Sequence, residues 1–184
     1  MRVLGLDVAT TCGWALVDNA TGKERSLGRG VITLARAPSD EIEKLVDYAL
    51  SAPAHKPDLV VVELPYLDKN PATLLCLAML AGRFQQAFEV AGFPVELLRA
   101  TQWQRTVLGG FGGKKRDGLK KAAVLWARAT FGVPMTGDEA DAHGIAACVL
   151  RAKTYQGKCK TSPRAETTAG TKKGLGHGTL RPDR

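Results

Sequence analysis

Apolar residues fall into short continuous runs in the first third of the chain and into helically spaced stretches further on. Residues 2–8, 12–19 and 25–34 have the length and apolar content of three consecutive strands. The first of them is apolar on both faces, which is typical of a strand at the centre of a sheet. The runs at 58–63 and 95–98 predict a fourth and a fifth strand. The pattern therefore predicts five strands, of which the first three follow one another directly.

Helices are predicted between and after these strands. Ser39 is a good N-cap for a helix whose apolar positions share one face, and we expect Pro57 to stop it. Pro71 begins a long helix that continues to about Ala91. Further helical patterns cover 101–107, 114–131 and 137–155. Elements in this order predict an α/β domain whose first three strands form a meander.

Residues 157–184 differ in composition from the rest of the chain. They are rich in Lys, Thr and Gly, and they carry seven basic against two acidic side chains. This segment therefore supplies five of the eight net positive charges. With almost no large apolar residues it cannot bury enough surface to fold. We expect residues 1–156 to form one domain, followed by a disordered basic tail that suits nucleic acid or simply aids solubility.

Cysteine usage and hydropathy limit the compartment and the cofactors. Cys12, Cys76 and Cys148 lie in apolar stretches and are predicted to be small buried thiols. The four cysteines of the chain lack metal-ligand spacing, so we expect neither zinc nor a disulfide framework, and a cytoplasmic location. The chain has no run of about 18 apolar residues and no signal-peptide layout at its N-terminus, so we expect no membrane partner.

Four separated carboxylates are the candidate catalytic residues. Asp7 and Glu63 each end an apolar run, whereas Asp138 and Asp141 open the last helix and share one of its faces. A carboxylate at the end of a buried strand is costly unless a cation meets it, and hard divalent cations take oxygen ligands. Each acid alone could be a solvated strand end or a partner of the helix dipole. Together the four predict a metal-dependent centre.

Other residues near these acids have simpler interpretations. Thr136 and Glu139 have the spacing of a capping box, so Glu139 is interpreted as structural. His143 lies about 200° around the helix from Asp141, which favours a role outside the site. Trp14 and Trp126 are predicted to be core residues, and the sequence leaves Trp103 undecided.

Basic residues gather around the glycine-rich segment 109–113. This segment lacks the Gly-Lys-Ser/Thr ending of a phosphate-binding P-loop, so a clamp on a DNA backbone is the better interpretation. Tyr66 could stack on a base or pack against its neighbours. The predicted DNA-binding residues are Tyr66, Arg99, Arg105, Lys114, Lys115, Arg116, Lys120 and Lys121.

Four motifs in order resemble the RuvC family of Holliday junction resolvases, which are nucleases of the RNase H-like fold. The resemblance covers about residues 2–155. The motifs are Leu4-Gly-Leu-Asp7 with Gly13-Trp14-Ala15, Val61-Val62-Glu63-x-x-Tyr66 with Asn70 and Leu80-Ala-Gly-Arg83, Val107-x-Gly109 through Lys115, and Asp138-Glu-Ala-Asp141-Ala142.

The resemblance implies an RNase H-like fold with a five-stranded mixed sheet flanked by helices. It implies an Mg²⁺-dependent, structure-selective endonuclease that resolves four-way DNA junctions as a homodimer by paired phosphodiester hydrolysis. It further implies two Mg²⁺ ions per site, with Mn²⁺ as a substitute, held by Asp7, Glu63, Asp138 and Asp141. Lys115 would neutralise the reacting phosphate or contact the DNA backbone. The apolar helix at 71–91 is predicted to contribute to the dimer interface.

The chain also departs from the family pattern. Val8-Ala9 follows Asp7 where the family has Pro-Gly, and Gln104 replaces a family lysine with Arg105 beside it. Tyr66 stands where the family often has Phe. These differences indicate a divergent member, phage-encoded or bacterial. The alternatives are a nuclease for other branched DNA such as flaps and forks, a non-catalytic junction-binding protein, and, less well supported, a fragment of an actin-like or sugar-kinase ATPase.

Overall fold

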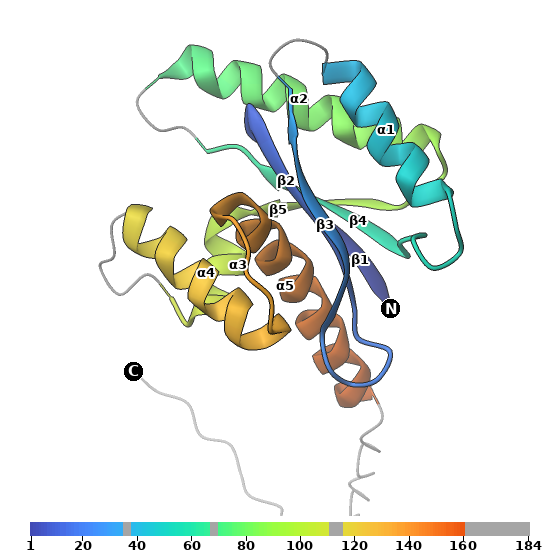
Figure 1. The fold of residues 1–184 in the computed structure, drawn as a ribbon, viewed down its shortest axis with the longest axis vertical. Coiled ribbons are helices and arrows are strands. Elements are labelled where there is room, and N and C mark those ends of the chain that lie inside the picture. The colour runs from blue at the N-terminus through green and yellow to red at the C-terminus, as the bar shows by residue number, and fades with distance from the viewer. Residues whose placement is uncertain (35–37, 67–69, 111–115, 161–184) are drawn as a thin grey trace, which may run out of the picture.

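The computed structural model of the chain describes residues 1–34, 38–66, 70–110 and 116–160, without the side chains of residue 116 and residues 155–160. Its centre is one five-stranded sheet with the strand order β3-β2-β1-β4-β5 (Figure 1). The first three strands form an antiparallel meander, and the last two run parallel to the first. The strands are β1 (Arg2–Asp7), β2 (Thr11–Asp18), β3 (Arg25–Thr33), β4 (Leu59–Leu64) and β5 (Val95–Arg99). The predicted mixed sheet with β1 at its centre is confirmed.

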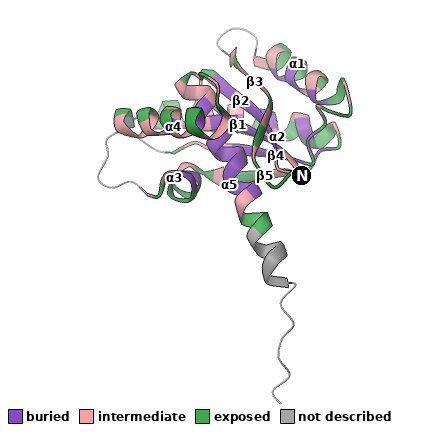
Figure 2. Cartoon of the chain, turned by 60° about the horizontal axis from the view of Figure 1, so that its bottom comes forward, coloured by how far each residue is buried: buried purple, intermediate pink, exposed green. Residues whose placement is uncertain are grey.

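Helices cover both faces of this sheet (Figure 1). Alternate residues of β1 point to opposite faces, so Leu4 packs with the helices of one layer and Val3 with those of the other. This is why the inner residues of β1 and β4, Val3–Leu6 and Leu59–Val62, are apolar on both faces. One layer contains α1 (Pro38–Leu50) and α2 (Pro71–Val90), and the other contains α3 (Ala100–Leu108), α4 (Arg116–Phe131) and α5 (Gly137–Lys160). Figure 2 shows the buried residues concentrated in the sheet and in the half of α5 that lies on it.

Two glycines let α5 lie directly on the sheet. A Cβ atom at Gly5 of β1 would lie 2.3 Å from the carbonyl oxygen of Ala142, and one at Gly13 of β2 would lie 2.1 Å from that of Asp138. Any larger residue at either position would push the helix away. The glycines therefore bring the first turn of α5 to the end of β1, which is where the candidate site lies.

Several helix ends differ from the prediction. Helix α1 begins at Pro38, so Ser39 lies in its first turn and is not its N-cap. Helix α1 ends at Leu50, so Pro53, and not Pro57, is the proline that follows its end. A residue before proline is disfavoured in the helical conformation, and Ser51 donates its hydroxyl to the carbonyl oxygen of Tyr48 instead. Helix α5 continues to Lys160 rather than 155, because Gly157 weakens a helix without stopping it.

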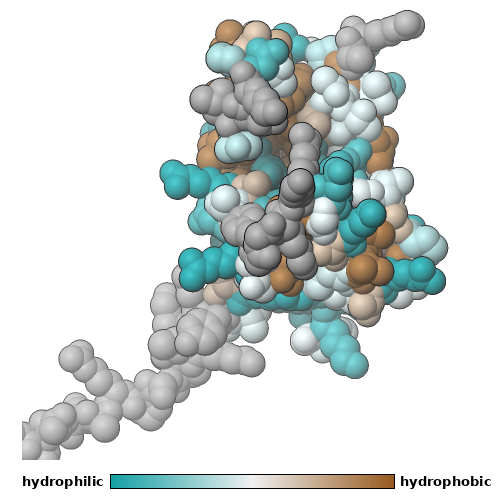
Figure 3. Space-filling view, turned by 90° about the vertical axis from the view of Figure 1, so that its left-hand side faces the viewer, coloured by the Kyte–Doolittle hydropathy of each residue, from teal (hydrophilic) through white to brown (hydrophobic). Residues whose placement is uncertain are grey.

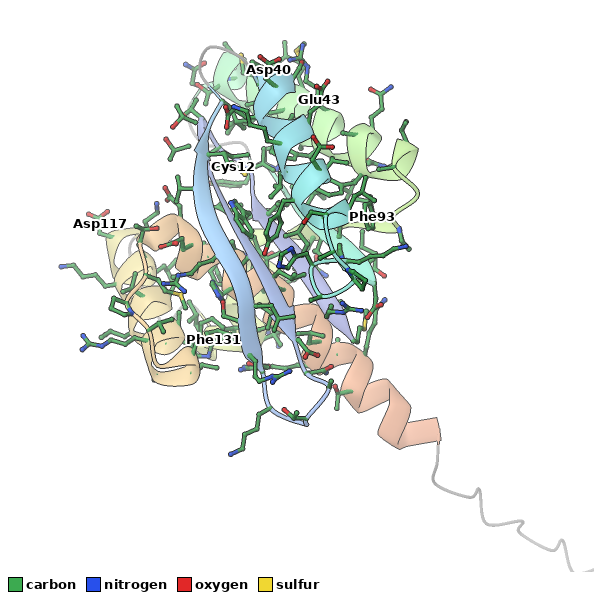
Figure 4. The ribbon with its side chains drawn as sticks, turned by 45° about the vertical axis from the view of Figure 1, so that its right-hand side comes forward. Cys12, Asp40, Glu43, Phe93, Asp117 and Phe131 are labelled. Atoms are coloured by element: carbon green, nitrogen blue, oxygen red, sulfur yellow. The ribbon has the colours of Figure 1, made fainter. Side chains whose placement is uncertain are left out.

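Side-chain burial corrects one prediction about the cysteines. Cys12 and Cys148 are buried as expected, but Cys76 is exposed on the outer face of α2. The helical run around Cys76 is apolar on both faces, so hydropathy alone could not show which side packs on the sheet. Figure 4 labels Cys12 on β2.

Within the described ranges, no helix is long and apolar enough to span a membrane.

Candidate active site

Asp7 and Glu63 leave neighbouring parallel strands at the same level. Leu6 of β1 pairs with Val62 of β4, so the next residue of each strand is one of the two acids. Their carboxyl groups share a hydrogen bond. On the other side of β1, Asp7 pairs with Gly13, the glycine that contacts the backbone of Asp138. The sheet register and the contact with α5 thus bring acids from three elements to one edge.

Electrostatics place the fourth carboxylate in the same region. Burial raises the pKa of Glu63 well above its usual value, and the nearby charges of Asp7 and Asp141 raise it further. Burial likewise raises the pKa of the Cys12 thiol, with smaller contributions from Asp7 and Asp138. The four acids that the sequence selected therefore lie in one region of the structure and come from β1, β4 and the first two turns of α5.

This donor set fits hard divalent cations such as Mg²⁺. The raised pKa of Glu63 shows that burial and the neighbouring charges disfavour a further negative charge here, which a bound cation would offset. Carboxylate oxygens are also the ligands that Mg²⁺ prefers. Among the described residues, however, no three His, Cys, Asp or Glu side chains are arranged as a metal site as they stand.

Lys120 of α4 forms an ion pair with Asp138, one of the four acids. Its Nζ lies 2.8 Å from Oδ1 of Asp138, and this hydrogen bond raises the pKa of the lysine. The charges of Asp141 and Asp7 also raise it. A lysine predicted to contact DNA thus lies among the carboxylates, whereas its neighbour Lys121 is exposed.

Glu139, between the two acids of α5, has a structural role. Its Oε2 accepts from the backbone N–H of Thr136 at 2.8 Å, and its own N–H donates to the Thr136 hydroxyl oxygen at 3.2 Å. This is the predicted capping box, which is confirmed. Arg29 of β3 pairs with the other oxygen at 3.4 Å. Glu139 therefore starts the helix and faces away from the cluster.

His143 is fully buried and is bonded within the fold. Its Nδ1 lies 2.7 Å from the carbonyl oxygen of Glu139, and its Nε2 lies 2.8 Å from the Ser26 hydroxyl. A carbonyl oxygen can only accept, so Nδ1 carries the proton and Nε2 accepts from Ser26. Phe131, labelled in Figure 4, packs on its ring with a centroid distance of 4.7 Å. His143 thus links α5 to β3.

Trp103 is the functional candidate that the sequence left undecided. It is 1% exposed, and its indole N–H donates to Oε2 of Glu63 at 3.3 Å. The two residues are far apart in the chain, and no local spacing relates them, so no sequence signal could have shown the contact. Trp14 and Trp126, predicted as core, are partly buried against the two core clusters.

The remaining predicted DNA-binding residues lie on the surface or outside the described ranges. Tyr66, two residues beyond β4, is 75% exposed, and Arg99 and Arg105 are exposed at the start and on the outer side of α3. Lys114 and Lys115 lie outside the described residues, and the side chain of Arg116 is not described. Lys120 and Lys121 line an open pocket of about 410 Å³ with Val124 and Leu125. Figure 3, from the left-hand side of Figure 1, shows hydrophilic side chains among smaller apolar patches.

The chain belongs to the family described as crossover junction endodeoxyribonuclease RuvC, whose sequence model matches residues 3–149. It is 32% identical over 158 residues to the RuvC of Salinibacter ruber, covering 80% of this chain and 84% of that protein. It is 29% identical over 153 residues to the RuvC of Paramagnetospirillum magneticum, covering 80% and 90%.

Solved structures of resolvases have the same fold. The RuvC of Thermus thermophilus, in complex with a Holliday junction substrate, matches with a TM-score of 0.64 and 21% identity, covering 84% of this chain and 98% of that one. The yeast mitochondrial Holliday junction resolvase Ydc2 matches with a TM-score of 0.58 and 19% identity, covering 86% and 83%. The expected RNase H-like fold is confirmed.

Proposed function

We propose that this chain is a metal-dependent endonuclease that resolves four-way DNA junctions as a homodimer. The observation that carries the proposal is the buried carboxyl group of Glu63, which meets Asp7 and Asp141 at the edge of a sheet. A fold gains no stability from acids gathered in this way, so their purpose is to hold cations. Membership of the RuvC family supplies the substrate class.

Asp7, Glu63, Asp138 and Asp141 would hold two Mg²⁺ ions. When bound, such ions activate a water molecule and neutralise the charge of the reacting phosphate. The carboxylates themselves bind and orient the ions, and Asp7, adjacent to both β4 and α5, is best placed to serve both of them. Mn²⁺ would substitute, because it also accepts oxygen ligands.

Lys120 and the predicted basic residues would contact the DNA phosphates. Lys120, whose ammonium group lies against Asp138, would contact the phosphate of a DNA strand bound at this cluster. Arg99, Arg105 and Lys121 are exposed on the same side of the sheet as α4 and suit backbone contacts. Lys114, Lys115 and Arg116 are proposed as further contacts on the segment that leads into α4. Tyr66, which projects from the end of β4, would stack on a base at an opened junction.

The outer face of α2 supports the homodimer. Leu75 is 63% and Met79 58% exposed, and Cys76 lies between them on the same face. Exposed apolar side chains gathered in this way mark an interaction surface. Figure 1 shows α2 at the outside of its layer, where a second copy could lie against it. Two symmetric cuts in a four-way junction require two sites related by a twofold axis.

Cys76 allows the interface to be tested directly. The other described cysteines, Cys12 and Cys148, are buried, so a Cys159→Ser variant would keep one accessible thiol. A short bismaleimide should link two chains of this variant into a covalent dimer, and a Cys76→Ser, Cys159→Ser variant should remain uncross-linked. Light scattering that finds a monomer both free and on junction DNA would refute the dimer.

The central experiment is cleavage of a labelled synthetic four-way junction, with linear duplex and flap substrates as controls. We expect paired cuts in the junction with Mg²⁺ or Mn²⁺ and none in EDTA, since uncompensated acids repel phosphate. Ca²⁺ should support binding without turnover, because its larger and looser ligand shell positions water poorly. Faster cleavage of flaps than of junctions would assign a different branched substrate, and full activity in EDTA would refute the metal site.

A further inference from the structure

Trp103 is the largest fully buried side chain in the described part of the chain, and it carries a polar group into the core. A buried indole N–H needs an acceptor, and here the acceptor is Oε2 of Glu63 at 3.3 Å. The indole N–H can only donate, so it cannot replace Glu63 as a ligand for a cation. It binds one carboxylate oxygen and leaves the other for different partners.

The position of Trp103 follows from the connection between β5 and α3. Strand β5 ends at Arg99 and α3 begins at Ala100, with no loop between them. Leu98 of β5 pairs with Glu63 of β4, so the first turn of α3 lies beside that acid. The Gln102 side chain accepts from the backbone N–H of Arg99 at 3.1 Å and fixes this turn. Trp103 is therefore held on a rigid element.

The ring of Trp103 also contacts the helix that carries the other acids. A Cβ atom at Gly144 of α5 would lie 2.6 Å from the ring, so the indole rests directly on the helix backbone at that residue. Asp141 lies about one turn earlier on the same helix, and Asp138 lies about two turns earlier. A single side chain thus bonds to the acid of β4 and sets how closely α5 approaches it.

We propose that Trp103 is a positioning residue of the nuclease centre, which orients Glu63 through its N–H and fixes α5 through its ring so that both sets of carboxylates face the same cations. This inference rests on the proposed function. Groups that bond to metal ligands in this way typically change metal affinity or activity by about 10- to 100-fold when they are removed. The effect of Trp103 should therefore appear in metal binding before any DNA is present.

The test compares Trp103→Phe with Trp126→Phe in the full chain. Phe keeps most of the ring and removes the N–H, and Trp126 packs on the same core cluster without bonding to Glu63. Calorimetric titration of the free protein with Mn²⁺ should show about tenfold weaker binding for Trp103→Phe and no change for Trp126→Phe. At saturating Mn²⁺, Trp103→Phe should cleave more slowly while its junction affinity in Ca²⁺ stays within about twofold.

A second measurement keeps Trp103 in place. In a Trp14→Phe, Trp126→Phe variant Trp103 is the sole tryptophan of the chain. The fluorescence of Trp103 should change on Mg²⁺ titration, because a cation held by Glu63 would change the charge of the carboxylate that accepts the indole N–H. Unchanged fluorescence at saturating Mg²⁺ would overturn the proposal even if Trp103→Phe fails to fold. Equal losses of Mn²⁺ affinity in the Trp103 and Trp126 variants would also overturn it. Wild-type protein that neither binds Mn²⁺ nor cleaves DNA would instead refute the proposed function.

Discussion

Lys120 Nζ lies 2.8 Å from Asp138 Oδ1, so a cation from α4 already occupies part of the carboxylate cluster. Its neighbour Lys121 points to solvent from the same turn. The pair offers a matched comparison of a lysine inside the cluster with one outside it. Lys120→Gln should bind Mg²⁺ in the absence of DNA at least as tightly as wild type, because the competing ammonium group is gone. It should nevertheless cleave more slowly, because the reacting phosphate loses a cation.

Lys121→Gln should affect DNA binding rather than metal binding. It should leave Mg²⁺ affinity unchanged, weaken junction binding slightly and reduce the slope of log affinity against log salt by about one. Calorimetry for the metal and fluorescence anisotropy for the junction would measure both variants. Identical behaviour of the two lysine variants would show that the contact with Asp138 has no functional weight.

The carboxylates should separate catalysis from binding. Asp7→Asn and Asp141→Asn should each lower cleavage by several orders of magnitude, because Asn keeps the size of the side chain and loses the charge that holds a cation. Junction affinity should stay unchanged or become tighter, since less negative charge faces the phosphates. Both variants should also stabilise the metal-free protein, because both charges disfavour ionised Glu63. A thermal melt in EDTA would measure this gain.

Glu139→Gln is the matched control on the same helix. It weakens the capping box with Thr136, which should cost about 1 kcal/mol of unfolding free energy or less, and it should leave cleavage nearly unchanged. Normal cleavage by Asp141→Asn together with an inactive Glu139→Gln would contradict the assignment of the helix face.

The basic tail should contribute to DNA affinity but not to folding. Removing residues 161–184 keeps the whole of α5 and deletes five of the basic side chains of the predicted tail. The melting temperature should stay the same, and junction binding should weaken and depend less on salt, by about 0.9 in slope for each lost phosphate contact. An unchanged salt slope would show that the tail does not touch the DNA.

The sheet, and the meeting of the four acids in one region, could be predicted from the sequence because both depend on local patterns. Asp7 and Glu63 end apolar runs, and strands that run parallel bring such ends to one edge. The sequence also contains a signal for the close approach of α5 to the sheet, since a glycine inside a strand often marks a place where another backbone comes close. Gly5 and Gly13 carry that signal, and only the structure shows which helix they admit.

Contacts that depend on the rotation of a helix could not be predicted. Lys120 and Lys121 are equivalent as residue types, and only the packing of α4 decides which one meets Asp138. The bond between Trp103 and Glu63 joins two elements through tertiary packing alone. Cys76 was wrongly predicted as buried for the same reason, because α2 is apolar on the face that points away from the sheet.

His143 should make stability depend on pH below neutrality. Burial, and to a lesser extent the charge of Arg29, lower its pKa from 6.5 to about 4, while its bond to Glu139 opposes the shift. The folded protein therefore holds neutral His143 where the unfolded chain already binds a proton. The contribution is fully present above pH 6.5 and is lost progressively as the pH falls from 6.5 to about 4. It amounts to about 3 kcal/mol.

Urea unfolding at several pH values would measure this loss. A His143→Gln variant cannot titrate at this position, so its unfolding free energy should be lower at pH 7.5 and should fall less between pH 6.5 and 4.5 than that of wild type. A Ser26→Ala variant tests the geometry, because the Nε2 that accepts from Ser26 is the atom that must take up the proton. Its neutral His143 would lose a partner, so Ser26→Ala should be less stable than wild type at pH 7.5, with a smaller difference at pH 4.5. Parallel pH profiles for wild type and His143→Gln would show that the acid sensitivity comes from other groups.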